Sequence, residues 1–280
     1  QVICEQAKEA AEHGAKIVVF PELCITGYTC NDLFLQELLL EKAKEALLTI
    51  AEETGQLETL FLVGLPVDKD GRLYNVAAVL YRGRILGMIP KKNIPMYAEF
   101  YEGRHFTPGE ETVTEYRLGK QVIPFGSNLL FRCEELPELI LGCELCEDLW
   151  VAEPPSTSHA LMGATVIANL SASNETVSKD DYRTLLIKAS SARLLCGYIY
   201  TSAGEGESTQ DLVFGGHDLI AENGTLLVQS ARFTTGILYT DLDVLKISSE
   251  RRRMGTFGKR PMKPYLTVPF SMQLTGTKLD

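Results

Sequence analysis

The sequence contains few of the residues that most often carry proton transfer and metal chemistry. Four histidines and one tryptophan occur among 280 residues, and no two histidines are spaced as ligands of one metal ion. No apolar run approaches the roughly 18 residues that span a bilayer, and the first residues lack the layout of a signal peptide. These absences disfavour a zinc site, a membrane-spanning segment and a secreted chain.

Positive charge is also scarce. The chain has 27 lysines and arginines against 37 aspartates and glutamates, which gives a formal net charge of -10. An acidic surface is repelled by nucleic-acid backbones and by anionic membranes, so we expect neither as a partner. The one basic run, residues 251–253, is interpreted as a solvated turn or helix end.

The cysteines do not form a disulfide framework. Their number, seven, is odd, they are scattered, and the chain is far larger than those that need disulfides to fold. Cys143 and Cys146 spell C-x-x-C, but there is no second such pair to complete a four-ligand zinc site. We therefore expect no metal, a reducing compartment and a cytoplasmic location.

The pattern of apolar residues predicts an α/β chain in which helices and strands alternate, with some hairpins. Hydrophobic residues make up 45% of the sequence, enough for the core of one large domain. Asn31 or Asp32 is expected to cap the second helix. Expected helices are 2–13, 32–53, 156–162 and 178–195; expected strands are 16–20, 59–65, 74–81, 84–89, 139–143, 164–170, 198–202, 217–221, 225–230 and 236–241. This order predicts an α-β-β-α sandwich with two mixed sheets, a layered α+β arrangement.

The domain organisation is expected to be simple. Residues 1–250 are predicted to form one domain, and residues 251–280 are interpreted as a tail or as the start of a linker to a domain that this chain lacks. The chain opens on Gln1 and enters a helical pattern at once, so we expect that sequence precedes it. No Gly-rich phosphate-binding loop is found.

Three residues with complementary chemistry follow predicted strands. Glu22 and Lys91 each stand just past a strand, and Cys146 follows a buried strand beside two acids. A cysteine is mostly protonated at neutral pH, so a nucleophilic cysteine needs a base or a cation beside it. No histidine follows a strand near these positions, which disfavours a papain-like pair and leaves Glu22 and Lys91 as the candidate partners. The alternative for Cys146 is a small buried core residue.

Three segments resemble the signatures of the nitrilase, or carbon–nitrogen hydrolase, superfamily. They are Phe20-Pro21-Glu22-Leu23, Pro90-Lys91 with Pro95 nearby, and Cys146-Glu147-Asp148-Leu149-Trp150. Their wider context, in 21–33, 97–106 and 144–150, is similar to the glutamine amidotransferase (glutaminase) domain of bacterial glutamine-dependent NAD synthetases. The similarity covers most of the chain, through residues 251–254.

The resemblance assigns roles to individual residues. It implies that Glu22 is the general base, Lys91 the stabilising cation, Cys146 the nucleophile and Glu99 a second glutamate held against the lysine. Four further residues match positions that contact glutamine: Tyr28, Tyr97, Glu147 and Ser173. Lys179 departs from the pattern, because it stands where an arginine is expected to bind the α-carboxylate, and a lysine lacks the bidentate fork.

The function implied by the resemblance is hydrolysis of the glutamine side-chain amide to glutamate and ammonia through a cysteine thioester. Ammonia would pass to a C-terminal NAD synthetase domain that uses ATP and deamido-NAD, and this domain itself would need no cofactor. A homo-oligomer is expected. Two alternatives remain open at this point: a free-standing amidase, carbamoylase or nitrilase of the same superfamily, and a non-catalytic binding module with a relic cysteine.

Overall fold

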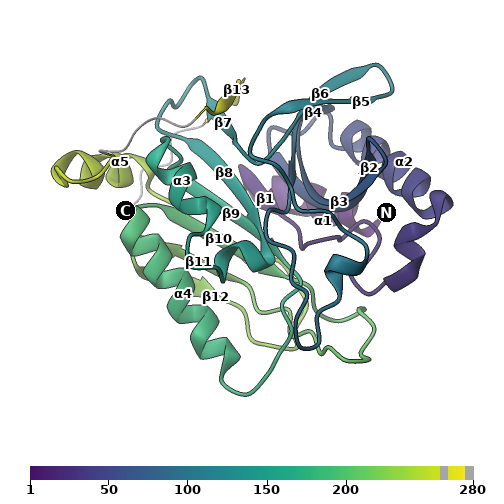
Figure 1. Cartoon of the computed structure of the whole chain (residues 1–280). Helices are drawn as coiled ribbons and strands as arrows, with labels where there is room; N and C mark the ends of the chain where they lie inside the picture. Colours follow the sequence, from purple (N-terminus) through teal and green to yellow (C-terminus); the bar gives the residue numbers. More distant parts are fainter. Residues whose placement is uncertain (259–263, 275–280) are drawn as a thin grey trace.

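The structure is a computed structural model of the chain, and it describes residues 1–258 and 264–274 (Figure 1). The described residues form two mixed sheets. The first has the order β1 (Ile17–Val19), β2 (Leu60–Lys69), β3 (Arg72–Tyr81), β4 (Arg84–Pro90), β6 (Gln121–Phe125) and β5 (Thr114–Leu118). The second has the order β12 (Thr225–Gln229), β11 (Leu219–Glu222), β10 (Gly197–Ser202), β9 (Val166–Ser171), β8 (Ile140–Leu145), β7 (Leu129–Cys133) and β13 (Leu266–Phe270).

Strand β2 shows how the first sheet acquires two buried faces. Successive side chains of a strand point to opposite faces, and β2 is apolar at nearly every position. Leu60 and Leu62 belong to a cluster that also contains residues of the second sheet. Phe61 and Val63 belong to a cluster on the other face, formed with the helices α1 (Val2–Glu12) and α2 (Glu37–Glu53).

The second sheet is covered in the same way. Its outer face packs against α3 (Pro155–Leu161) and α4 (Lys179–Leu194), as Figure 1 shows. Ile187 and Leu194 of α4 share a buried cluster with Tyr198 of β10 and Leu219 of β11. The predicted α-β-β-α sandwich with two mixed sheets is therefore confirmed, with one apolar core between the sheets and one beneath each helical layer.

The predicted start and cap of the second helix were wrong. Residues Asn31–Leu35 form a 3-10 helix, and α2 begins only at Glu37, because the backbone of Gln36 is extended with φ -90° and ψ 124°. Asp32 does not cap the helix. Its carboxylate accepts hydrogen bonds from Nε and Nη2 of Arg104, both at 2.8 Å, and lies 3.0 Å from Nε2 of His105.

The predicted strand 236–241 was also wrong. These residues pair with no strand in the described part of the chain, and the ring of Tyr239 instead packs 5.1 Å from the ring of His13. Conversely, four strands were not predicted: β5, β6 and β7, in the stretch between the lysine and the cysteine, and β13 near the end of the chain. The other expected elements are present with bounds shifted by a few residues.

The last part of the chain adds two elements to the fold. Helix α5 (Val244–Arg253) is capped by Asp243, whose carboxylate accepts a hydrogen bond from the backbone N–H of Lys246 at 2.8 Å. Strand β13 pairs in parallel with β7 at the edge of the second sheet. The domain boundary near residue 250 stays a prediction, and the basic run does end a helix. No helix in the described ranges is long and apolar enough to cross a membrane.

Candidate active site

The three candidate residues follow strands of both sheets at one edge of the sandwich. Glu22 comes shortly after β1, Lys91 directly after β4, and Cys146 directly after β8. The backbone N–H of Glu22 donates to the carbonyl of Ser171, the last residue of β9, at 3.2 Å. This bond joins the two sheets, so the carboxyl ends of these strands gather their side chains between the layers.

Lys91 is fully buried and lies between two carboxylates. Its Nζ is 2.7 Å from Oε1 of Glu22 and 2.6 Å from Oε1 of Glu102. Burial alone would lower the pKa of this ammonium, but the charges of Glu102 and Glu22 outweigh it and hold the pKa well above its ordinary value. Lys91 is therefore a fixed positive charge inside the protein.

The carboxylate that accompanies Glu22 at Lys91 is Glu102, so the assignment of that contact to Glu99 was wrong. Glu102 begins a 3-10 turn (Glu102–Arg104) that carries its side chain inward, where it is 5% exposed. Glu99 lies in the preceding loop, and its Oε1 accepts instead from Nδ2 of Asn174. The two glutamates are three residues apart, and the direction of the loop, which the sequence pattern does not reveal, selects between them.

Glu22 has one occupied and one free carboxylate oxygen. Oε1 accepts from Lys91 and, at 2.7 Å, from Nδ2 of the buried Asn75 of β3. Oε2 is buried and has no hydrogen-bond partner among the residues that the structure describes. Burial raises the pKa of Glu22 to about 7, with Lys91 opposing the rise and Glu102 adding to it. A carboxylate with a free oxygen and a pKa near neutrality suits a general base.

Cys146 sits on a strained turn. Its φ of 41° lies in the left-handed region, which costs energy for a residue with a side chain and is a feature of functional sites. Its backbone N–H donates to Oδ1 of Asn169 at 3.1 Å, and Asn169 is held in turn by the hydroxyl of Ser171 at 2.7 Å. Asn169 thus fixes the backbone of the cysteine.

The thiol of Cys146 is protonated at rest. Its side chain is buried, and burial is the largest cause that raises its pKa above the ordinary value, followed by the charge of Glu22, while Lys91 lowers it. Both charges act on this pKa, and the bonds from the N–H of Cys146 to Asn169 and from the N–H of Glu22 to Ser171 bring the two residues to the same end of β9. The predicted grouping of Glu22, Lys91 and Cys146 is present in the structure.

Asp148 connects the loop that follows Lys91 to the loop that carries the cysteine. Its Oδ1 accepts from the backbone N–H and the Nδ2 of Asn93, at 2.8 and 2.7 Å, and its Oδ2 accepts from the N–H of Leu145 at 3.0 Å. We did not single out this function from the sequence, although the acid stands two residues after Cys146. Asp148 thereby fixes the position of the segment after Lys91 relative to the segment that carries Cys146.

The residues expected to bind substrate surround this centre, and two of them contact each other. The hydroxyl of Tyr97 lies 2.9 and 3.0 Å from the two carboxylate oxygens of Glu147. Tyr97 is 54% exposed and Glu147 is half-buried, so this pair lies at the surface above Cys146. Burial raises the pKa of Glu147, and the hydrogen bond from Tyr97 opposes that rise.

Tyr28 and Ser173 are both buried. The hydroxyl of Tyr28 donates to Oε1 of Glu102 at 2.8 Å, so it supports the lysine from the far side. The backbone N–H of Ser173 donates to the hydroxyl of Ser202 at 3.1 Å. Its own hydroxyl accepts from Nη2 of Arg183 at 3.3 Å.

Lys179 is the first residue of α4 and is half-buried. Its Nζ donates to Oδ1 of Asn174 and lies 5.1 Å from the ring centre of Trp150 and 5.5 Å from that of Phe100. Burial lowers the pKa of this lysine. Aromatic faces attract a cation, so the ammonium is held at the rim by two rings as well as by an amide oxygen.

Arg183, which we did not identify from the sequence, lies one helical turn beyond Lys179. It is fully buried and donates to Oε1 of Glu175 at 2.8 Å and to Nδ1 of His217 at 3.0 Å, in addition to Ser173. A guanidinium is therefore present near the position where an arginine was expected, but a carboxylate of the protein pairs with it. Arg183 could have been found from the sequence because residues four positions apart lie on the same face of a helix, and it follows Lys179 by four.

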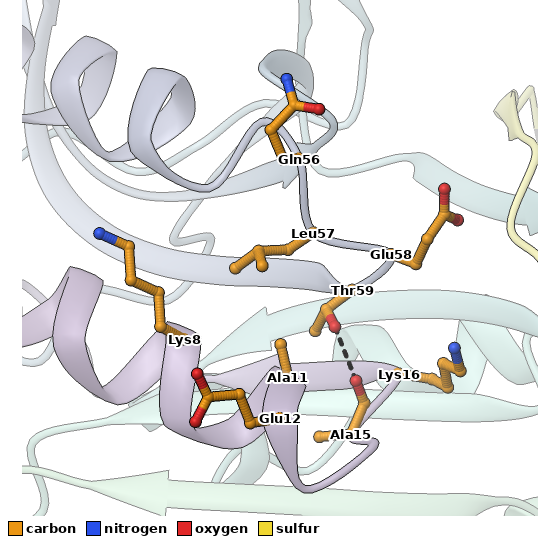
Figure 2. A pocket seen from close by; sticks show the side chains of 9 residues that line it. All are labelled: Lys8, Ala11, Glu12, Ala15, Lys16, Gln56, Leu57, Glu58 and Thr59. Carbon is orange, nitrogen blue, oxygen red and sulfur yellow. Dashed lines mark hydrogen bonds between the residues drawn. The ribbon is translucent and has the colours of Figure 1, made fainter.

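Two hollows occur elsewhere in the described part of the chain. Figure 2 shows one of about 250 Å³ between α1 and the segment before β2, where the hydroxyl of Thr59 donates to the carbonyl of Ala15 at 2.7 Å. The other, of about 330 Å³, is lined by residues that include Arg132, Ile140 and Arg251. Both lie at the starts of strands, at the opposite end from Glu22 and Cys146.

No group of histidine, cysteine, aspartate and glutamate side chains in the described residues is arranged to hold a metal ion. All seven cysteines carry free thiols. Cys143, the other member of the C-x-x-C pair, is buried, and burial raises its pKa well above the ordinary value.

The sandwich and its buried glutamate, lysine and cysteine define a carbon–nitrogen hydrolase. Residues 1–252 match the family described as carbon-nitrogen hydrolase, and the chain belongs to it. A curated relative is the glutamine-dependent NAD(+) synthetase of Mycobacterium tuberculosis, which is 44% identical over 257 residues. The alignment covers 91% of this chain and 38% of that relative, so the chain spans about two fifths of the relative's length.

Solved structures agree with this placement. A glutamine-dependent NAD(+) synthetase from Cytophaga hutchinsonii superposes with a TM-score of 0.74 at 30% identity, covering 82% of this chain and 37% of that one. A carbon–nitrogen hydrolase from Helicobacter pylori superposes with a TM-score of 0.73 at 18% identity, covering 95% and 93%. The second likeness concerns the fold alone.

Proposed function

We propose that this chain hydrolyses the side-chain amide of glutamine to glutamate and ammonia, with Cys146 as the nucleophile. The observation that carries the proposal is the buried centre in which Glu22 keeps one oxygen free beside a protonated thiol and a fixed ammonium. The substrate is inferred from the related proteins of M. tuberculosis and C. hutchinsonii, because their names state a dependence on glutamine.

The first half of the reaction forms a thioester. Glu22 takes the thiol proton as Sγ of Cys146 attacks the carboxamide carbon, which avoids forming a free thiolate in a buried site. The oxyanion is stabilised by Nζ of Lys91 and by the backbone N–H of Glu147. The N–H of Cys146 is not available for this purpose, because Asn169 already accepts it.

The second half releases the products. Glu22 returns its proton to the departing nitrogen, so ammonia leaves and the γ-carbonyl stays bound to sulfur as a thioester. Water then enters, Glu22 removes a proton from it, and its oxygen attacks the same carbonyl. Collapse of this second intermediate breaks the C–S bond, releases glutamate and returns the proton to the sulfur. Glu102 contributes by holding Lys91 in place from the opposite side.

Recognition of glutamine requires groups of both signs, because the α-amino and α-carboxylate groups of the substrate are charged. We propose that Glu147, supported by Tyr97, attracts the ammonium, and that Lys179 attracts the carboxylate as a point charge. Ser173 would supply a hydroxyl. Tyr28 and Glu99 were expected at the site, and their hydroxyl and carboxylate are turned to Glu102 and Asn174, so we assign them to positioning.

The wider setting follows from the same relatives. We propose that ammonia made here is used by a C-terminal NAD synthetase domain, with ATP and deamido-NAD bound there and no cofactor in this domain. Residues 251–280 would include the start of a linker to that domain, in addition to strand β13, which pairs with β7 in this domain. The free state of all seven thiols supports a reducing, cytoplasmic location. We also propose a homo-oligomer.

A substrate panel tests the proposal. Ammonia release from glutamine is compared with release from simple amides, carbamoyl compounds and nitriles, for the unmodified chain and for Cys146→Ala. We expect glutamine to be preferred and Cys146→Ala to be inactive. Faster release from a simple amide or nitrile would instead make the chain a free-standing member of the family. Failure of a glutamine-like electrophile to label Cys146 would favour a non-catalytic module.

A further inference from the structure

The carboxylate of Glu207, on a loop distant in sequence, accepts hydrogen bonds from the backbone next to the active site. Glu207 lies in the segment between β10 and β11, and its Oε1 accepts from the N–H of Tyr28 at 2.7 Å. Its Oε2 accepts from the N–H of Thr29 at 3.1 Å and from the hydroxyl of Thr29 at 2.7 Å. Two adjacent backbone groups and one side chain are thus bound by one half-buried carboxylate.

The residue held in this way reaches the catalytic lysine. The hydroxyl of Tyr28 donates to Oε1 of Glu102 at 2.8 Å, and the same oxygen lies 2.6 Å from Nζ of Lys91. The ring of Tyr28 is buried among apolar side chains that include Phe214, 5.7 Å away on the same segment as Glu207. A continuous series of short contacts therefore runs from Glu207 through Tyr28 and Glu102 to Lys91.

We propose that Glu207 is a positioning residue for the reaction, which acts on Lys91 through Tyr28 and Glu102. The proposal rests on the proposed function, because it assigns Lys91 to stabilising the oxyanion. Without the carboxylate, the N–H groups of Tyr28 and Thr29 lose their acceptor and the phenol is no longer held against Glu102. The ammonium then loses its defined position on one side. The hydroxyl of Tyr28 contacts Glu102 and acts on Lys91 rather than on the substrate. We therefore expect the loss of the Glu207 carboxylate to change kcat more than KM.

Ammonia release from glutamine by the full chain tests this inference. A misplacement of about 1 Å can cost ~100-fold in rate, so we expect partial loosening in Glu207→Ala to lower kcat by about tenfold with KM changed less than about threefold. Glu207→Gln keeps one acceptor oxygen and is expected to lose less. Glu205→Ala, an exposed glutamate of the same loop, is the matched control and should leave kcat unchanged.

A double-mutant cycle separates positioning from general loss of structure. If Glu207 acts through the hydroxyl of Tyr28, then Glu207→Ala should lower kcat little further, by less than about twofold, in a Tyr28→Phe background. The same tenfold loss in both backgrounds would overturn the inference, as would an unchanged kcat in Glu207→Ala itself.

The rate at which iodoacetamide alkylates Cys146 gives a second readout that does not require turnover. Lys91 favours the thiolate, so we expect slower labelling in Glu207→Ala and no further slowing in the Tyr28→Phe background. A chain that releases no ammonia from glutamine but shows this labelling pattern contradicts the proposed function and supports the role of Glu207. Equal labelling of Glu207→Ala and the unmodified chain contradicts that role.

Discussion

At the scale of single residues, burial determines where the proton of the active site resides. The carboxyl of Glu22 has a pKa of about 7, Lys91 stays charged because two carboxylates flank it, and the buried thiol of Cys146 stays neutral. Above about pH 7 the resting site therefore holds a thiol, a carboxylate and an ammonium rather than a thiolate. Proton transfer has to accompany the attack of sulfur on the amide.

The pH dependence of activity follows from the pKa of Glu22. The base acts when deprotonated, so kcat/KM is expected to rise as pH increases through about 7 and to be lost as pH falls below it. The thiol adds no rise in the same range, because its pKa is raised. The measurement is kcat/KM for glutamine between acidic and mildly alkaline pH.

Glu144 provides the control for that profile. Burial also raises the pKa of this carboxyl to about 7, but it bonds to Tyr198 and to the backbone of Ser156 rather than to the triad. Glu144→Gln should therefore keep the acidic limb near the same pH, whatever its effect on the maximum rate. Disappearance of the limb in this variant would show that Glu144, not Glu22, titrates.

The identity of the glutamate at Lys91 can be tested with two neighbouring residues. Loss of an oxyanion-stabilising donor costs ~100-fold or more in kcat, so Glu102→Gln, which removes one of the two charges that hold Lys91, should lower kcat by about that factor. Glu99→Gln, which changes only a contact to Asn174, should lower it by less than about tenfold. The reverse order would restore Glu99 as the partner of the lysine.

At the scale of secondary-structure elements, α5 is attached to the sandwich through Arg251. Its guanidinium donates to the carbonyls of Ala164, Leu194 and Leu195 at 2.6, 3.0 and 2.9 Å. Leu194 and Leu195 end α4, where unpaired carbonyls carry partial negative charge. The guanidinium of Arg251 thus supplies the hydrogen-bond donors that these carbonyls lack, and no carboxylate of the described residues pairs with it.

Removal of this side chain should weaken the fold. Hydrogen bonds to a charged group contribute about 1.5–3 kcal/mol each, and water replaces part of that loss, so we expect Arg251→Ala to lower the free energy of unfolding by about 2–3 kcal/mol. Arg252→Ala, at the exposed next position, should change it by less than about 0.5 kcal/mol. Urea unfolding measures both, and equal values would contradict this role of Arg251.

The elements that could be predicted are those whose own pattern determines them. The apolar spacing of α2 and α4 and the continuous apolar runs of β2 and β9 need no information from elsewhere. The start of α2 could not be predicted, because Asp32 is taken by Arg104 from a distant loop. The stretch 236–241 has the pattern of a strand but pairs with no strand within residues 1–258 and 264–274. Local propensity cannot report either event.

At the scale of the whole molecule, the active site too could be predicted only where a local sequence pattern marks its residues. Glu22, Lys91 and Cys146 could be predicted because each follows a strand and carries a recognisable neighbourhood. Glu102 and Asn169 could not, because Glu102 contacts Lys91 only after its loop has turned inward, and Asn169 contacts Cys146 only after β9 has paired with β8. The sequence pattern identifies the reacting groups, and the tertiary structure determines the residues that hold them.

The length of this chain compared with its relatives limits which activities can be assigned to it. Family membership rests on residues 1–252, while the relative of M. tuberculosis is more than twice as long as the aligned part. The residues proposed to hydrolyse the amide all lie within this chain. Use of the ammonia in NAD synthesis depends on a domain that lies outside this chain and stays a proposal.

The central claim is that Cys146 carries the γ-acyl group of glutamine during the reaction. The most direct measurement is mass spectrometry of the chain quenched in acid while it turns over glutamine, followed by peptide mapping. We predict a γ-glutamyl group on the peptide that contains Cys146, present in the unmodified chain and absent from Cys146→Ala. Glutamate formed by Cys146→Ala at the rate of the unmodified chain, or an acyl group on another residue, would contradict the account.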